Sequence, residues 1–195
     1  MQSLSSSKII LIGASAGGPG VIEKLIASLP DNFSIPICIV QHFPSELTNS
    51  FASKLQMRTS NKVIESYDGM ILDKGTIVIA KGGMHLGFRC ISDHFAIEQT
   101  QTGIRNDFIP SVDMMMVSST KVYEPSSILA ILLSGIGDDG VEGMVKIHEL
   151  GGFTICQDEK SSAVFGMPAR AIERGAAKAI LSIEEIATTI VKFAS

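Results

Sequence analysis

Apolar residues along this chain fall into two alternating patterns. Short continuous runs, several of them rich in isoleucine, are typical of parallel strands that are buried on both faces. Between them, apolar residues recur at every third or fourth position, which is typical of helices with one buried face. The continuous runs predict strands at 8–13, 35–41, 63–64, 127–134, 153–157 and 179–181. The periodic segments predict helices at 19–29, 48–55, 112–117, 141–147, 166–174 and 183–193.

Strands that alternate with helices predict an α/β fold with a doubly wound, mainly parallel sheet, in the three-layer arrangement of Rossmann-like domains. The segment from 69 to 102 differs, because it holds short strands separated by glycine-containing and Ser92-Asp93 turns. We expect its strands at 76–80, 85–89 and 95–99 to pair antiparallel, as a hairpin region at the side of the main sheet.

The length of 195 residues predicts one domain over residues 8–195, with a short disordered lead at 1–7 and no receiver domain before it. Hydrophobic residues make up 45% of the chain and charged residues 18%, which excludes a disordered protein. The net charge is −4 and no basic cluster is present, so we expect no nucleic-acid partner. Without a signal sequence or an apolar run of membrane-spanning length, we expect a cytoplasmic protein with no direct membrane insertion.

Ser15 lies on a glycine-rich turn, in the run IGASAGGPG, between the first predicted strand and the first helix. Three interpretations are open: a helix cap, a dinucleotide-binding turn, or a nucleophile turn of the G-x-S-x-G kind. Dinucleotide binding requires an acidic residue at the end of the second strand, where this chain has Gln41 and His42. The glycine pattern alone does not decide between the other two.

Three predicted strands end in reactive side chains, namely Ser15, His42 and the pair Asp138 and Asp139. The carboxyl ends of parallel strands share one edge of a sheet, so these residues can converge there as nucleophile, general base and orienting acid. Each also has a structural interpretation, because histidines close strands and acids begin helices.

Other candidate residues fit less well. An α/β-hydrolase order would need Asp113 and His148, but His148 falls within a helical pattern on an expected solvated face. His85 and His94 lie in the hairpin region and are expected to be structural or exposed. The three cysteines and four histidines lack metal-ligand spacing, so we expect reduced thiols, no metal and no cofactor.

Five motifs together resemble the catalytic domain of the chemotaxis protein-glutamate methylesterases: IGASAGG, IVQHFP, PSVD, LLSGIGDDGVEGM and QDEKSSAVFGMP. The resemblance covers nearly the whole chain. It implies hydrolysis of glutamyl methyl esters on chemoreceptors or a related signalling protein, with deamidation of glutamines at the same site. It places the nucleophile on Ser15, the base on His42 and the acid on Asp139.

The resemblance also implies that the backbone N–H groups of Ala16 and Ile136 bind the oxyanion. We expect the substrate-binding residues to include Phe108, Ile109 and Met167. A receiver-domain protein acting in trans is a further expected partner. The rival interpretation is a diverged, non-catalytic module of the same fold that binds a signalling partner.

Four features depart from the family pattern. Ala16 replaces a usual threonine, Ile136 a usual methionine and Asp138 a common asparagine, while Asp107-Phe108-Ile109 replaces an Arg-His-Arg run. Main-chain donors survive a change of side chain, so the first two changes are expected to matter little. The altered run predicts weaker attraction to glutamate-rich receptor helices, unless Lys81 or Arg105 supplies the missing charge.

Overall fold

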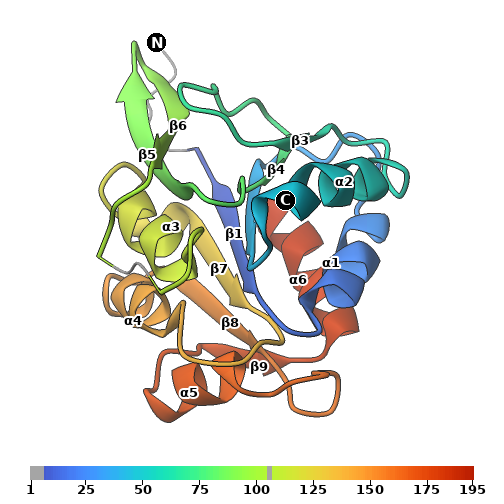
Figure 1. The fold of residues 1–195 in the computed structure, drawn as a ribbon. Coiled ribbons are helices and arrows are strands. Elements are labelled where there is room, and N and C mark those ends of the chain that lie inside the picture. The colour runs from blue at the N-terminus through green and yellow to red at the C-terminus, as the bar shows by residue number, and fades with distance from the viewer. Residues whose placement is uncertain (1–6, 105–106) are drawn as a thin grey trace.

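The computed structural model describes residues 7–104 and 107–195. Residues 1–6 of the lead predicted at 1–7, and Arg105, lie outside the described residues. Its main sheet has seven strands in the order β3-β4-β2-β1-β7-β8-β9, and β5 and β6 form a separate two-stranded sheet (Figure 1). The strands are β1 Ile9–Ala14, β2 Ile37–Gln41, β3 Val63–Glu65, β4 Ile77–Ile79, β5 His85–Ile91, β6 His94–Thr100, β7 Ile128–Leu132, β8 Phe153–Gln157 and β9 Ala179–Leu181. The helices are α1 Gly18–Ala27, α2 Ser45–Gln56, α3 Val112–Ser119, the 3-10 turn η2 Pro125–Ser127, α4 Val141–Glu149, α5 Met167–Glu173 and α6 Ile183–Ala194.

Every pairing in the main sheet is parallel, which confirms the predicted fold class. The central strand β1 pairs with β2 on one side and with β7 on the other. In the first pairing Ala14 lies opposite Gln41, and in the second Gly13 lies opposite Leu132. The carboxyl ends of these three strands therefore meet at one place on the edge of the sheet.

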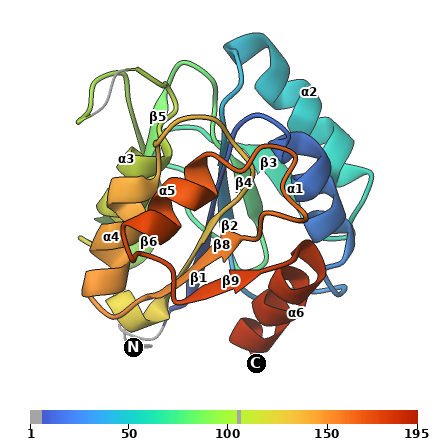
Figure 2. The ribbon, with the colours of Figure 1, turned by 90° about the horizontal axis from the view of Figure 1, so that it is seen from below.

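The sheet forms the middle of three layers, with α3, α4 and α5 on one side and α1, α2 and α6 on the other (Figure 2). Alternate residues of each central strand face opposite layers, and both faces are apolar. Ile9 and Leu11 of β1 pack in the cluster on the α3 side, whereas Ile10 and Ile12 pack in the cluster on the α1 side. Burial on both faces is the reason for the continuous isoleucine-rich runs in the sequence.

One predicted strand belongs to a different sheet from the one expected. The strand predicted at 76–80 is β4, and it lies between β3 and β2 in the main sheet with parallel pairing to both. Its residues Ile77–Ile79 are fully buried, so the segment has the character of a central strand and not of a flap. The other two strands predicted in this segment, β5 and β6, pair antiparallel as expected.

Two helices begin with a serine whose side chain caps the helix, as serine does in preference to most residues. The Ser111 hydroxyl accepts a hydrogen bond from the backbone N–H of Met114 at the start of α3. Ser182 and Glu185 form a reciprocal capping box at the start of α6. Helix α2 begins at Ser45, three residues before the prediction, because its first turn is mostly polar and its one large apolar residue, Leu47, is exposed.

A substitution at Gly13 tests how closely β1 packs against α3. A Cβ atom at this position would lie 2.3 Å from Cγ1 of Val112, which is closer than real contacts allow. We expect Gly13→Ala to lower the free energy of unfolding by about 1–3 kcal/mol, because the packed helix must shift. Urea denaturation measures the change.

Gly20→Ala is the matched control, because nothing lies within 4 Å of a Cβ at that helical position. It should leave stability unchanged or raise it slightly, since alanine favours helix more than glycine does. Equal stability losses in the two variants would contradict the close packing of β1 on α3.

Candidate active site

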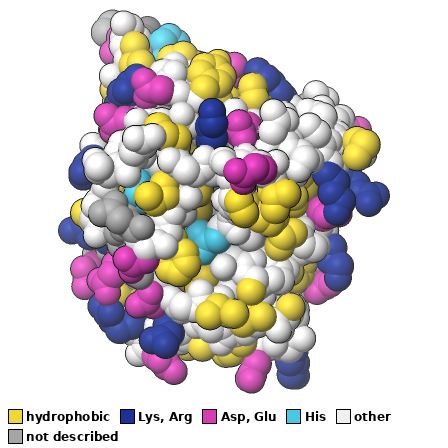
Figure 3. Space-filling model, in the orientation of Figure 1, with side chains coloured by type: hydrophobic (Ala, Val, Ile, Leu, Met, Phe, Trp, Pro, Cys, Tyr) yellow, Lys and Arg dark blue, Asp and Glu magenta, His cyan; other side chains and the backbone are white. Residues whose placement is uncertain are grey.

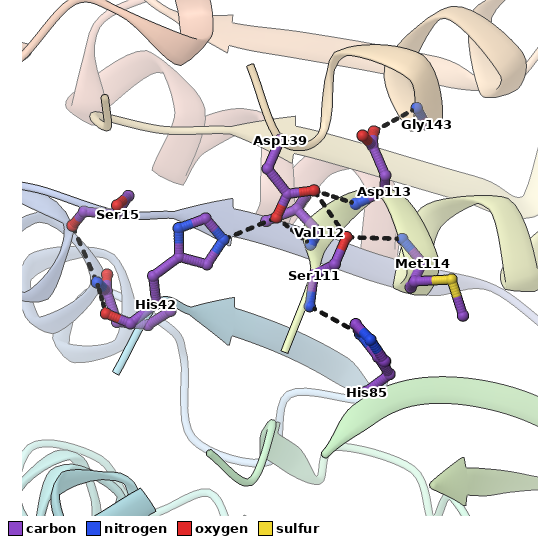
Figure 4. Close-up of polar contacts among 10 residues, drawn as sticks. Ser15, His42, His85, Ser111, Val112, Asp113, Met114, Asp139 and Gly143 are labelled. Carbon is purple, nitrogen blue, oxygen red and sulfur yellow. Dashed lines mark hydrogen bonds and ion pairs between the residues drawn. The ribbon is translucent and has the colours of Figure 1, made fainter. Parts of the chain in front are cut away.

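Three neighbouring strands bring the predicted site residues together. Ser15 follows β1, His42 follows β2, and Asp139 lies in the turn between β7 and α4. Figure 4 shows the imidazole of His42 between the other two, with Ser15 on one side and Asp139 on the other. Residues far apart in the sequence are thus placed side by side by strand order alone.

The carboxylate of Asp139 is fully buried and accepts four hydrogen bonds. Oδ2 accepts from Nε2 of His42 at 2.7 Å and from the backbone N–H of Val112 at 2.7 Å. Oδ1 accepts from the hydroxyl of Ser111 at 2.7 Å and from the backbone N–H of Asp113 at 3.0 Å. Asp139 therefore sits at the N-terminus of α3, where unpaired amides and the helix dipole favour a negative charge.

The turn that carries Asp139 depends on a glycine. Gly140 has a φ of 97°, and a Cβ there would lie 2.7 Å from Cγ1 of Val112. Only a residue without a side chain allows this close approach of the β7–α4 turn to α3. The GDDG segment of the sequence thus serves to bring the acid against a helix end.

Hydrogen bonding outweighs burial at Asp139. Burial alone raises the pKa of this carboxyl, whereas the bonds from His42, from the two backbone amides and from Ser111 lower it. The net pKa lies below its ordinary value, so the group is ionised at neutral pH. An ionised acid is what a histidine needs beside it to carry a transient positive charge.

The orientation of His42 follows from its bond to Asp139. A carboxylate only accepts, so Nε2 carries the proton and the neutral ring leaves Nδ1 as its basic nitrogen. Nδ1 is buried and has no hydrogen-bond partner among the described residues. In Figure 4 this nitrogen lies on the side of the ring that faces Ser15. His42 is therefore oriented to accept a proton from that side.

Phe108 fixes the ring of His42 from one face. The two rings are stacked, with centroids 4.4 Å apart and an interplanar angle of 3°. A Cβ atom built on Gly137 would lie 3.9 Å from Cζ of Phe108, so the turn after β7 is also in contact range of this ring. Phe108, which was predicted to bind substrate, thus contacts the histidine directly, and its contact with substrate stays a prediction.

The main chain around Ser15 is held by several bonds. Its N–H donates to the carbonyl of Ser134, and its carbonyl accepts from the N–H of Gly18 at 2.9 Å and from Nε2 of Gln41 at 2.9 Å. The N-cap of α1 is Gly17 and no side chain caps this helix, so Ser15 is not a helix cap. Its hydroxyl makes no hydrogen bond to the described residues and is available for chemistry.

The backbone N–H groups of Ala16 and Ile136 lie beside Ser15, and hydrogen bonds to the preceding carbonyls fix their directions. Because peptide groups are planar and trans, pinning the Ser15 carbonyl also aims the N–H of Ala16 in the opposite direction. The Gly135 carbonyl accepts from the N–H groups of Gly166 and Met167, which aims the N–H of Ile136 in the same manner. Among the described residues neither N–H donates a hydrogen bond.

Gly135 brings the second of these amides close to the serine. A Cβ on Gly135 would lie 2.9 Å from Cβ of Ser15 and 2.2 Å from Sδ of Met167. Met167, predicted to bind substrate, is fully buried against Gly135, and a substrate contact for it stays a prediction. Ile136 itself is 64% exposed at the rim.

Exposed residues near the site in the sequence include both apolar and acidic side chains. In Figure 3 a histidine near the middle of the face shown borders hydrophobic side chains on its lower left and side chains of other types or backbone elsewhere. Ile109, predicted to bind substrate, is half-buried, and its carbonyl accepts from the N–H of Gly83; a substrate contact for it stays a prediction. Asp138 and Asp107 are exposed acids close in sequence to the site residues.

Other candidates from the sequence lie elsewhere. Asp113 is buried and accepts from the N–H of Gly143 in α4, and His148 lies against Thr154 on β8. They do not meet Ser15, so the alternative hydrolase order is wrong. Within residues 7–104 and 107–195 no group of three or more His, Cys, Asp or Glu side chains is placed to hold a metal ion.

Gln41 was missed by the sequence reasoning. It is the last residue of β2 and is 2% exposed, and it donates to the carbonyl of the candidate nucleophile. Its signal is a single polar residue at the end of an apolar strand, directly before His42.

Comparison with known proteins identifies the family and the fold of the chain. A family model described as CheB methylesterase matches residues 10–190. The chain belongs to the CheB methylesterase family. The crystal structure of the Thermotoga maritima CheB methylesterase catalytic domain superposes with a TM-score of 0.92 at 34% identity, covering 96% of this chain and 98% of that one.

Curated relatives are longer than this chain. A protein-glutamate methylesterase/protein-glutamine glutaminase of Carboxydothermus hydrogenoformans is 40% identical over 190 residues, which are 96% of this chain and 54% of that protein. One from Rhodospirillum rubrum is 37% identical, over 95% of this chain and 50% of its own length. The chain thus spans about half the length of these methylesterases. None of the helices in the described part of the chain is long and apolar enough to cross a membrane.

The lowered pKa of Asp139 predicts how stability changes in acid. The folded pKa lies below the unfolded value of about 3.9, so the ionised carboxylate stabilises the fold above that pH. This contribution is lost as the pH falls through the folded pKa. Asp139→Asn should lower the unfolding free energy by about 2 kcal/mol at pH 7. It should also flatten the loss of stability below about pH 4.

Urea denaturation at several pH values measures both effects. Asp138→Asn is the matched control, because this neighbour is exposed and its replacement should leave the pH profile of stability as in the wild type. Parallel profiles for wild type and Asp139→Asn would show that the buried carboxylate is not the group that couples folding to acid.

Proposed function

We propose that the protein is a serine hydrolase that removes methyl esters from glutamyl side chains and deamidates glutamines by the same steps. The observation that carries this proposal is the ionised Asp139 bound to His42, whose basic nitrogen faces a serine on a glycine-rich turn. The names of the relatives, protein-glutamate methylesterase and protein-glutamine glutaminase, support the same substrate class.

The first half of the reaction forms an acyl-enzyme. The Ser15 oxygen attacks the ester carbonyl carbon while its proton passes to Nδ1 of His42. Negative charge develops on the carbonyl oxygen, and the N–H groups of Ala16 and Ile136 stabilise it there. His42 then returns the proton to the leaving methanol, and the carbonyl remains joined to Ser15. For a glutamine the leaving group is ammonia.

The second half releases the product with water. His42 takes a proton from the water, which attacks the acyl carbonyl, and then protonates the departing oxygen of Ser15. The product is a glutamate carboxylate and the serine is restored. Asp139 stays ionised throughout, because its role is to orient the imidazole and stabilise its positive form.

The substrate protein is proposed to be a methylated chemoreceptor or a related signalling protein, and a receiver-domain protein acting in trans is a proposed regulator. Both would be cytoplasmic partners. The rival, a non-catalytic binding module, is disfavoured because such a module has no need of an ionised acid, an oriented imidazole and two directed amides around one serine.

A methanol-release assay tests the activity. Ser15→Ala should lower the release of methanol from methylated receptor membranes by about 10³-fold or more, because the three residues act as a unit. His42→Ala should have a similar effect. Equal rates for wild type and Ser15→Ala, on receptors and on soluble glutamyl methyl ester peptides, would exclude the hydrolase.

The exposed acid at Asp107 predicts a substrate preference. We expect Asp107→Arg to raise kcat/KM on glutamate-rich receptor helices by up to about tenfold, because opposite charges steer association. The value of kcat/KM should also fall more steeply with added salt than it does for the wild type. Asp93→Arg, a similar change at the tip of the β5–β6 hairpin, is the matched control. If both changes act alike, only net charge matters and the position of Asp107 does not.

A further inference from the structure

His85 is a buried histidine that the proposed reaction does not use. It is the first residue of β5, in the separate two-stranded sheet, and it has no exposed surface. Its Nδ1 accepts a hydrogen bond from the backbone N–H of Ser111 at 3.2 Å. A backbone amide can only donate, so Nδ1 carries no proton and the neutral ring holds its proton on Nε2.

Ser111 connects this histidine to the site. It is the N-cap of α3, with a φ of −103° and a ψ of 137°, so its own N–H points away from the helix. Its hydroxyl donates to Oδ1 of Asp139 at 2.7 Å. Figure 4 shows the resulting series of contacts from His85 through Ser111 and Asp139 to His42.

The four donors to Asp139 are not equally well fixed. The amides of Val112 and Asp113 belong to α3, and the helix itself sets their direction. The hydroxyl of Ser111 rotates about its Cα–Cβ bond and lies on a residue outside the helix. The direction of the Ser111 hydroxyl therefore depends on what holds the Ser111 backbone. The backbone N–H of Ser111 donates a hydrogen bond to Nδ1 of His85, which holds it in place.

We propose that His85 is a positioning residue of the active site, which holds the Ser111 backbone so that the Ser111 hydroxyl is aimed at Asp139. Asp139 in turn holds the imidazole of His42. The catalytic consequence rests on the proposed hydrolase function, whereas the structural consequence at His42 does not. The hairpin sheet thereby takes part in catalysis through the bond between His85 and Ser111.

Burial makes the loss of the hydrogen bond between His85 and Ser111 costly. Ser111, Asp139 and His85 are all fully buried, so water cannot replace a lost donor or acceptor among them. If Asp139 loses the Ser111 hydroxyl, three of its four donors remain. The strength of its hydrogen bond to the Nε2 proton of His42 then changes. The effect is expected on the chemical step and not on substrate binding.

Proton NMR tests the structural part without any substrate. The Nε2 proton of His42, shared with Asp139, should give a low-field resonance that is assigned by its loss in Asp139→Asn. His85→Gln and Ser111→Ala should each shift or broaden it, because glutamine cannot place an acceptor where Nδ1 lies. His85→Asn, whose side-chain oxygen lies near the Nδ1 position, should largely preserve it. Nitrogen shifts of the His85 ring should show an unprotonated Nδ1.

Kinetics with a soluble glutamyl methyl ester peptide test the catalytic part. His85→Gln and Ser111→Ala should each lower kcat by about tenfold with KM unchanged, since Ser111→Ala removes the hydroxyl bond to the ionised Asp139 and His85→Gln removes the bond that aims this hydroxyl. Because His85 acts through the Ser111 hydroxyl, the double variant should be no slower than Ser111→Ala alone. His85→Asn should recover most of the activity.

Several results would overturn the proposal. An unchanged low-field resonance in folded His85→Gln, or fully additive losses of kcat in the double variant, would leave His85 with a purely structural role. A failure of His85→Asn to restore the resonance would do the same. If His85→Gln does not fold, Ser111→Ala and His85→Asn still test the aim of the hydroxyl. Wild-type protein that shows the NMR pattern but hydrolyses no ester would contradict the proposed function and leave this inference standing.

Discussion

The buried carboxylate of Asp139 at the N-terminus of α3 is the interaction on which the site depends. An ionised group in the interior costs several kcal/mol unless hydrogen bonds replace its water, and here four donors do so. Those donors come from the end of β2 and from the start of α3. Asp139 therefore joins the sheet layer to the helix layer that contains α3. The orientation of the His42 imidazole depends on the position of the start of α3.

Much of this arrangement could be predicted from the sequence. Long buried strands give continuous apolar runs, and strands that alternate with helices must be parallel, so Ser15, His42 and Asp139 had to reach the same edge of the sheet. The fold class and the antiparallel pairing of β5 with β6 followed from local patterns alone.

What could not be predicted depends on contacts between distant segments. A strand as short as β4 carries too few residues to indicate its sheet or its direction. The stacking of Phe108 on His42 and the burial of Met167 against Gly135 depend on where loops settle on the finished fold. Gln41 and His85 bind backbone groups of Ser15 and Ser111. Every residue type carries those backbone groups, so the sequence does not indicate these partners.

The choice of ring nitrogen at His42 follows from the spacing of the sheet. Ala14 and Gln41 are partners across β1 and β2, so the next residues, Ser15 and His42, leave the sheet from adjacent positions. Neighbouring strands lie only about 4.8 Å apart. Over so short a span the nitrogen nearer the main chain is the one within reach of the serine, and the farther one extends toward the acid across the sheet edge. The order of strands thus selects which end of the imidazole faces Ser15, and this is the end at which the proposed proton transfer would take place.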